Sequence, residues 1–252
     1  DALHALGVRL FEQTAAELEQ AAGELRSDAD IAAILAQLHA DHPGRDALLG
    51  AYRDRMQAAR RFVNDRHLVS MPARERLEVM ATPAFLRPQI PFAAYVAPVP
   101  DDPEQHGYYY VTPAEDDQAL GEHNWAAIGH TCVHEAWPGH HLQFVKANQR
   151  PSAVSLPRRI NTSSTLYEGW ALYCEQLMQE QGFLDRAEAR FLVLRDRLWR
   201  ALRIQLDVEL HTRGLDIEAA AARMQEYLGF TREQALADLS WYTRAPTVPM
   251  GY

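Results

Sequence analysis

The chain has 252 residues, 47% of them hydrophobic, and a formal net charge of −9. This length and composition are ordinary for a globular protein with a sizeable core. The negative charge argues against a nucleic-acid-binding protein, because such proteins usually carry a basic face. Two cysteines, Cys132 and Cys174, are too few for a disulfide framework, so we expect free, packed thiols. No apolar run approaches the roughly 20 residues of a membrane-spanning helix, so we expect no span.

Residues 1–65 predict a helical lead-in. Apolar residues recur at helical spacing over residues 1–25, and two more helices are expected over about 28–38 and 45–62. The pattern then changes, and residues 76–113 predict a small sheet. Its strand candidates are short runs of residues that favour sheets, bounded by prolines: Leu77–Met80, Phe92–Val96 and Tyr108–Thr112.

The tyrosine-rich third strand allows two interpretations. It is an edge strand along which an extended peptide substrate lies, or it is simply sheet core. The first interpretation makes Tyr109 and Tyr110 candidate substrate-binding residues.

Residues 119–252 predict helices again. The first should cover about 119–148 with an interruption at Pro138-Gly139, followed by a loop that contains Pro151. Further helices are expected over 163–181, 186–212, 216–228 and 231–242, the last two capped by Asp216 and Thr231. The expected fold is mainly α with a small β-sheet (α+β). We expect a single domain, made of the lead-in (1–65), the sheet (76–113) and the helical region (119–252).

The run HEAWPGHH, from His134 to His141, concentrates three imidazoles and one carboxylate in an apolar setting. Burying such groups costs several kcal/mol unless they are paired or bind a metal. A catalytic zinc site needs three protein ligands, an open position and a base. We therefore predict a zinc site with His134 as the first ligand, Glu135 as the general base and Glu168 as a ligand from the following helix.

The second histidine ligand is either His140 or His141. The usual H-E-x-x-H spacing is absent, because Pro138 occupies the position of its second histidine. On an unbroken helix His141 faces the same way as His134 but lies about 10.5 Å further along the axis. Pro138 and Gly139 predict a kink that brings His140 round instead, so His140 is favoured. The alternative for the whole cluster is a structural hydrogen-bonded network.

Three segments carry a family resemblance: HEAWPGHHLQ (134–143), EGWALYCEQLMQEQG (168–182) and RALRIQLDVELHTRG (200–214). They resemble the bacterial family named domain of unknown function 885, which is itself similar to gluzincin-type zinc metallopeptidases. The resemblance implies a gluzincin-like helical catalytic domain with one zinc ion. The Gly-His-His-Leu segment is also similar to the Gly-His-Ala-Leu of carboxypeptidase Taq-type enzymes. By this resemblance His134 and His140 match the histidine ligands, Glu135 the base and Glu168 the glutamate ligand.

Helical peptidases such as angiotensin-converting enzyme use a downstream histidine and tyrosine to stabilise the oxyanion. By similarity His211 and Tyr242 are the candidates here, and purely structural roles are the alternative. Arg203 shares a helix with Arg200 and Asp207 at spacings that allow mutual ion pairs. These residues support the site from outside the ligands, clamp a substrate carboxylate, or form a buried structural pair.

The predicted function is zinc-dependent hydrolysis of a peptide or peptide-like amide bond. The alternatives are hydrolysis of a non-peptide amide or ester, and a non-catalytic helical binding module. The expected partner is a peptide or small amide, with no nucleic acid. Trp241-Tyr242 before Pro246 departs from the family's usual Arg-Tyr and Pro-Gly-Gln-Ala, and we expect a fragment of a longer bacterial protein. We find no signal peptide, and a chain that begins at Asp1 leaves a removed leader open.

Overall fold

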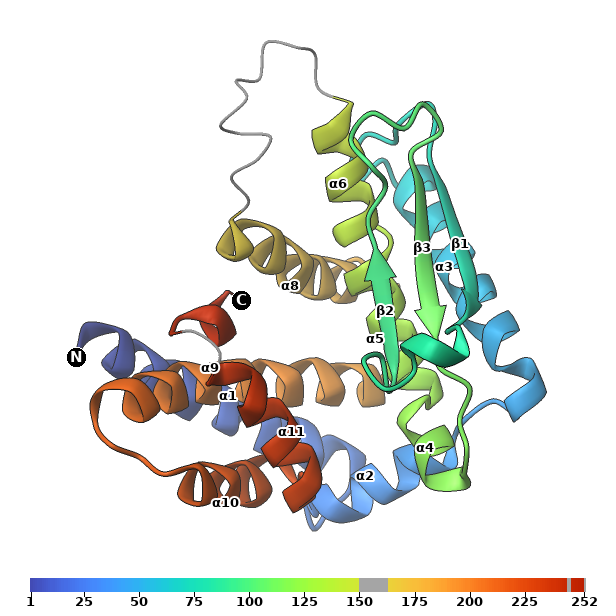
Figure 1. The fold of residues 1–252 in the computed structure, drawn as a ribbon. Helices are drawn as coiled ribbons and strands as arrows, with labels where there is room; N and C mark the ends of the chain where they lie inside the picture. Colours follow the sequence, from blue (N-terminus) through green and yellow to red (C-terminus); the bar gives the residue numbers. More distant parts are fainter. Residues whose placement is uncertain (150–162, 244–245, 252) are drawn as a thin grey trace. The chain divides into compact units, whose positions relative to one another are not determined.

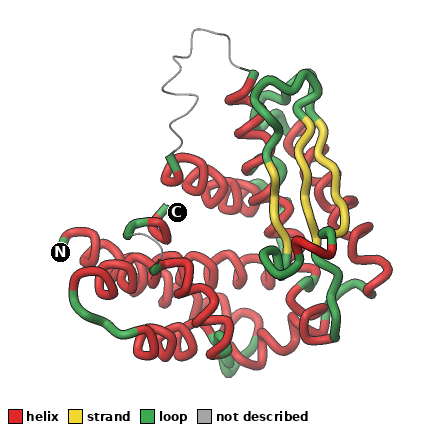
Figure 2. The backbone as a smooth tube through the Cα atoms, viewed as in Figure 1, coloured by secondary structure: helices red, strands yellow, loops and turns green. Residues whose placement is uncertain are grey.

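The computed structural model describes residues 1–149, 163–243 and 246–251 (Figure 1). Most of these residues are helical, and three strands form one small sheet (Figure 2). The expected mainly helical α+β fold is thereby confirmed, whereas the loop predicted around Pro151 lies outside the described residues. Among these residues, no helix combines the length and the apolar character needed to cross a bilayer.

The chain forms two compact units, which we call the terminal unit and the central unit. The terminal unit comprises Asp1–Ala36, Ser164–Leu166 and Arg186–Tyr252. The central unit comprises Gln37–Ser163 and Tyr167–Asp185. The expectation of one domain over the whole chain stays a prediction.

The terminal unit is built around two long helices, α1 (Ala2–Leu25) and α9 (Ala187–Thr212). They approach closely at Gly7, where an added Cβ would lie 3.0 Å from the Cβ of Ile204. The other elements are α10 (Ile217–Leu228), α11 (Arg232–Tyr242) and the short η3 (Val248–Met250). Both predicted N-caps are confirmed, because Asp216 accepts from the Ala219 amide and Thr231 forms a capping box with Gln234.

The sheet of the central unit contains β1 (Arg76–Ala81), β2 (Ala93–Val96) and β3 (His106–Val111) in the order β1-β3-β2. β3 pairs parallel with β1 and antiparallel with β2, with Tyr109 opposite both Val79 and Tyr95. The edge-strand interpretation of Tyr108–Thr112 is therefore wrong, because both edges of this strand are already paired.

The sheet-core alternative describes Tyr109 better. Its side chain is 1% exposed and packs on Tyr52, with ring centroids 5.5 Å apart. Tyr110 alternates with it on the pleat, is half-buried and stacks on Tyr108. A substrate contact by Tyr109 has no support in this packing, and one by Tyr110 stays a prediction.

The remaining helices belong to the central unit, except that α2 and α8 begin with residues of the terminal unit. They are α2 (Ile31–Ala40), η1 (Arg45–Ala47), α3 (Leu48–Asp65), η2 (Ala84–Leu86), α4 (Asp117–Glu122), α5 (Trp125–Glu135), α6 (His140–Asn148) and α8 (Ser164–Glu180). The helix predicted over 119–148 is thus three helices. The break at Pro138-Gly139 is confirmed, and a second break precedes α5, where Asn124 accepts from the Ala127 amide at 2.9 Å. Cys132 and Cys174 are buried, free thiols, as expected.

Candidate metal centre

The break between α5 and α6 requires glycine. The peptide before Pro138 is cis, and Gly139 donates its amide to the Val133 carbonyl at 3.1 Å. A Cβ on Gly139 would lie 1.8 Å from the carbonyl oxygen of His134, well inside contact distance. The first residue of α6, His140, is therefore held close to the last turn of α5.

Three side chains of the central unit converge at this break. Glu168 of α8 places its Oε2 atom 3.6 Å from His134 Nε2 and 3.4 Å from His140 Nε2. The three ligand atoms all lie within 4.8 Å of one another, and the two imidazole planes are 87° apart. Zinc bonds of about 2.1 Å in tetrahedral geometry separate ligand atoms by about 3.4 Å. The two nitrogen–oxygen distances match that spacing.

One oxygen of the Glu168 carboxylate faces both imidazoles without a hydrogen bond to the described part of the chain. Its Oε2 atom is buried and makes no hydrogen bond within the described residues. Burial alone would raise the pKa of this group, but His134 and His140 outweigh it and lower the pKa to about 2. A buried carboxylate oxygen without a hydrogen bond is unusual in proteins, and a divalent cation between it and the imidazoles would satisfy it.

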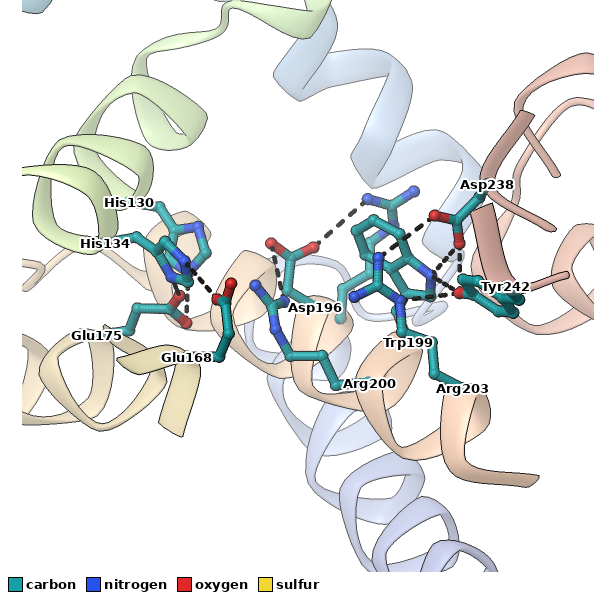
Figure 3. A network of polar contacts seen from close by, with 11 residues as sticks. His130, His134, Glu168, Glu175, Asp196, Trp199, Arg200, Arg203, Asp238 and Tyr242 are labelled. Carbon is teal, nitrogen blue, oxygen red and sulfur yellow. Dashed lines mark hydrogen bonds and ion pairs between the residues drawn. The ribbon is translucent and has the colours of Figure 1, made fainter. Parts of the chain in front are cut away.

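Behind His134 lies a fully buried carboxylate, Glu175 (Figure 3). Its Oε1 is 2.5 Å from His134 Nδ1, and its Oε2 is 2.7 Å from His130 Nε2. With Nδ1–H donating to Glu175, the Nε2 atom of His134 faces Glu168 and His140. Burial lowers the pKa of His134, but Glu168 and Glu175 together raise it to about 10. A carboxylate on the far nitrogen of a histidine is the usual outer support of a metal ligand.

The adjacent histidine, His141, has both nitrogens engaged elsewhere. Its Nε2 lies 3.0 Å from Glu75 Oε2, and its Nδ1 lies 3.2 Å from the Tyr95 hydroxyl. Glu75 in turn accepts from Arg60 Nε at 2.5 Å. The structure thus brings His140, and not His141, to Glu168, although metal binding by either stays a prediction.

Glu135, whose role as general base stays a prediction, is partly open to solvent. It ends α5 directly after His134, and it is half-buried where the residues on both sides of it are buried. It makes no hydrogen bond or ion pair to another described residue. Burial raises the pKa of Tyr95, and the negative charges of Glu135 and Glu75 raise it further.

Two candidate residues of the terminal unit, Arg203 and Tyr242, belong to one hydrogen-bonded cluster (Figure 3). Arg203 donates from Nε to the Tyr242 hydroxyl at 2.8 Å and pairs with Asp238 at 3.3 Å. The Tyr242 hydroxyl donates to Asp238, which also accepts from Trp199 Nε1 at 3.0 Å. Arg203 is only 5% exposed, so it is part of a buried pair, but its partner is Asp238 of α11 and not Asp207 of its own helix; a substrate clamp stays a prediction.

His211 joins the same unit. Its Nε2 lies 3.3 Å from the Tyr242 carbonyl oxygen and 3.6 Å from Asp207 Oδ1. Asp207 also accepts from the Thr247 amide at 3.0 Å, which ties the chain end to α9. Oxyanion-stabilising roles for His211 and Tyr242 stay predictions.

Sequence reasoning missed the supporting residues of the centre. His130 precedes His134 by four residues, and Glu175 follows Glu168 by seven, so each shares a helix face with a candidate ligand. Those spacings were readable signals. Glu75 carries no such signal, because it is 66 residues away from His141 along the chain.

The fold and this cluster define a mainly helical α+β protein with a candidate two-histidine, one-glutamate metal centre. The chain belongs to the family of bacterial proteins of unknown function DUF885, whose model matches residues 1–252. No curated protein matches the chain.

Two solved structures share the fold over 100% of this chain. One is a "putative lipoprotein" from Colwellia psychrerythraea, with a TM-score of 0.85 and 22% identity, of which the chain covers 43%. The other is a "putative lipoprotein of unknown function" from Shewanella oneidensis, with a TM-score of 0.85 and 25% identity, of which it covers 47%. The chain therefore spans less than half the length of these proteins.

Proposed function

We propose that this chain carries the zinc centre of a hydrolase that cleaves a peptide or peptide-like amide bond. The observation that carries the proposal is the convergence of His134, His140 and Glu168, with 3.4 and 3.6 Å between the histidine nitrogens and one buried carboxylate oxygen. Two histidines and one glutamate with an open fourth position are a ligand set of catalytic zinc. The similarity of the motifs to gluzincin peptidases supports the same assignment.

Each residue has a distinct task in this scheme. Bound zinc would polarise the scissile carbonyl and lower the pKa of water. Glu135 accepts a proton from the attacking water and passes it to the leaving amine. Glu175 holds the His134 ring in the orientation that presents Nε2 to the ion. A purely structural centre has no need of a free carboxylate beside its first ligand, so Glu135 argues against a non-catalytic binding module.

A peptide substrate has a place to lie along β2. Within the described part of the chain β2 is an edge strand, and its Tyr95 ring stacks on His140 with centroids 6.4 Å apart. An extended main chain that adds to a sheet edge gains hydrogen bonds without regard to its sequence. The edge next to the metal cluster is thus β2, and not the tyrosine-rich β3.

Both similar structures are described as lipoproteins, and this supports a location for the full-length protein. We propose that the full-length bacterial protein acts outside the cytoplasm as a lipid-anchored protein. Metabolic labelling with a radioactive fatty acid tests this: label on the full-length protein supports the assignment, and an unlabelled protein in the cytoplasmic fraction contradicts it.

Hydrolysis is tested on the zinc-loaded protein with a fluorogenic peptide library and a parallel panel of esters and non-peptide amides. Glu135→Gln keeps the size of the side chain and should retain zinc while kcat/KM falls at least about 100-fold. Glu180→Gln, at the end of α8, is the matched control and should behave as wild type. Full activity in Glu135→Gln, or no cleavage of any substrate by zinc-loaded wild type, would overturn the proposal. Cleavage of esters but not of peptides would change the proposed substrate from an amide to an ester.

A further inference from the structure

Three aromatic rings from three different elements surround His140. Tyr95 of β2 stacks on its imidazole at 6.4 Å, and Phe144 of α6 and Tyr167 of α8 each lie 5.9 Å from it. The rings also contact one another: Phe144 lies 6.3 Å from Tyr95 and 5.7 Å from Tyr167. We call these three residues the aromatic cluster.

The chain positions two of the three rings next to a residue of the candidate centre. Phe144 follows His140 by four residues, so both share one face of α6. Tyr167 directly precedes Glu168 on α8. Phe144 and Tyr167 are therefore fixed to the same helices as two of the proposed ligands, whereas Tyr95 reaches His140 from β2.

The rings of the aromatic cluster are partly open to solvent. Tyr95, Phe144 and Tyr167 are each half-buried, whereas core rings of the same unit such as Tyr52 and Trp137 are at most 1% exposed. Partly exposed aromatic surface beside a reactive centre offers apolar contact to a bound molecule.

Hydrogen bonding fixes Tyr95 so that it contributes its apolar face. Its hydroxyl lies 3.2 Å from His141 Nδ1, and His141 is held in turn by Glu75 at 3.0 Å. Glu75 is paired with Arg60. With the hydroxyl engaged, the ring stacks parallel to Phe144, with 17° between the planes. None of the three side chains is a cation that would attract an acidic group.

We propose that Tyr95, Phe144 and Tyr167 form a specificity subsite that binds an aromatic or large aliphatic side chain next to the scissile bond. This inference rests on the proposed function and narrows its substrate class to peptides with such a residue beside the cleaved amide. Offset or edge-on packing against several rings favours a flat apolar group over a small or charged one.

The test uses two hydroxamic acids that share one zinc-binding group. Acetohydroxamic acid carries a methyl group, and phenylacetohydroxamic acid carries a benzyl group. Their Kd values are measured by calorimetry on zinc-loaded wild type, Phe144→Ala and Tyr167→Ala, with zinc content and circular dichroism recorded for each. Tyr173→Ala is the matched control, because Tyr173 is a 51% exposed ring on α8 outside the aromatic cluster.

The benzyl compound should bind wild type and Tyr173→Ala at least about tenfold more tightly than acetohydroxamic acid. In Phe144→Ala and Tyr167→Ala this preference should fall below about threefold, with little change for acetohydroxamic acid. Two results would overturn the subsite but not the zinc centre. In the first, acetohydroxamic acid binds but wild type does not prefer the benzyl compound. In the second, Phe144→Ala and Tyr167→Ala both keep the preference for the benzyl compound. If neither compound binds the zinc-loaded protein, the subsite and the proposed function both fail.

Discussion

Glu175 Oε1 lies 2.5 Å from His134 Nδ1, and the side chain that makes this contact has no exposed surface. The other oxygen of Glu175 meets His130 Nε2 at 2.7 Å, so one buried carboxylate holds two imidazoles of α5. The His134 ring is consequently oriented before any ligand arrives. Such preorganisation raises metal affinity without a direct bond to the metal.

Replacing Glu175 should weaken zinc binding without removing a ligand. In Glu175→Gln the carboxylate partner of His134 is lost, so we expect the zinc Kd to rise about 10- to 100-fold. Competition with a fluorescent chelator measures this value. Glu180→Gln, on the same helix but exposed, should leave the Kd unchanged. An unaltered Kd in Glu175→Gln would show that the contact does not support the centre.

Gly139 should not tolerate a side chain. In Gly139→Ala the new Cβ collides with the His134 carbonyl, so we expect a loss of more than about 2 kcal/mol in the free energy of unfolding and a loss of zinc. Gly169→Ala is the control, because Gly169 lies within α8 with nothing within 4 Å of an added Cβ. It should be neutral or stabilising by up to about 1 kcal/mol in urea unfolding. Equal stability of both variants would contradict the geometry.

His123 should make stability depend on pH between about 4 and 6.5. Burial lowers its pKa from 6.5 to about 4, and its ring stacks on Phe92 and bonds the Tyr52 hydroxyl at 2.9 Å. The unfolded chain binds the proton more readily, so this contribution is complete above pH 6.5 and is lost as the pH falls towards 4. The loss is at most about 3.4 kcal/mol. His123→Gln should flatten the pH profile of urea unfolding over this range, and an identical profile would refute the assignment.

Local patterns predicted most of the helices and their caps. Asp216 and Thr231 cap helices as expected, because capping depends only on residues three positions away. The split at Asn124 was missed, although Gly121-Glu122-His123-Asn124 interrupts the apolar pattern and Asn124 supplies the amide cap of the new helix. The strand order could not be predicted, since pairing on both sides of β3 depends on residues far apart in the sequence.

The candidate centre, too, was predicted only where local sequence determines it. His134, His140 and Glu168 were selected from motifs, and the structure brings the three together. The preference for His140 followed from Pro138 and Gly139, whose backbone properties are readable from the sequence. The pairing of His141 with Glu75 and Tyr95 was beyond reach, because it joins a helix to two distant segments of the sheet region.

The zinc content of two adjacent-histidine variants tests the central claim most directly. Purified wild type, His140→Gln and His141→Gln are loaded with zinc, dialysed and measured by plasma mass spectrometry, with circular dichroism to confirm folding. The account predicts about one zinc ion per chain in wild type and His141→Gln and none retained in folded His140→Gln. Zinc lost from His141→Gln but kept by His140→Gln, or no retention by wild type, would contradict it.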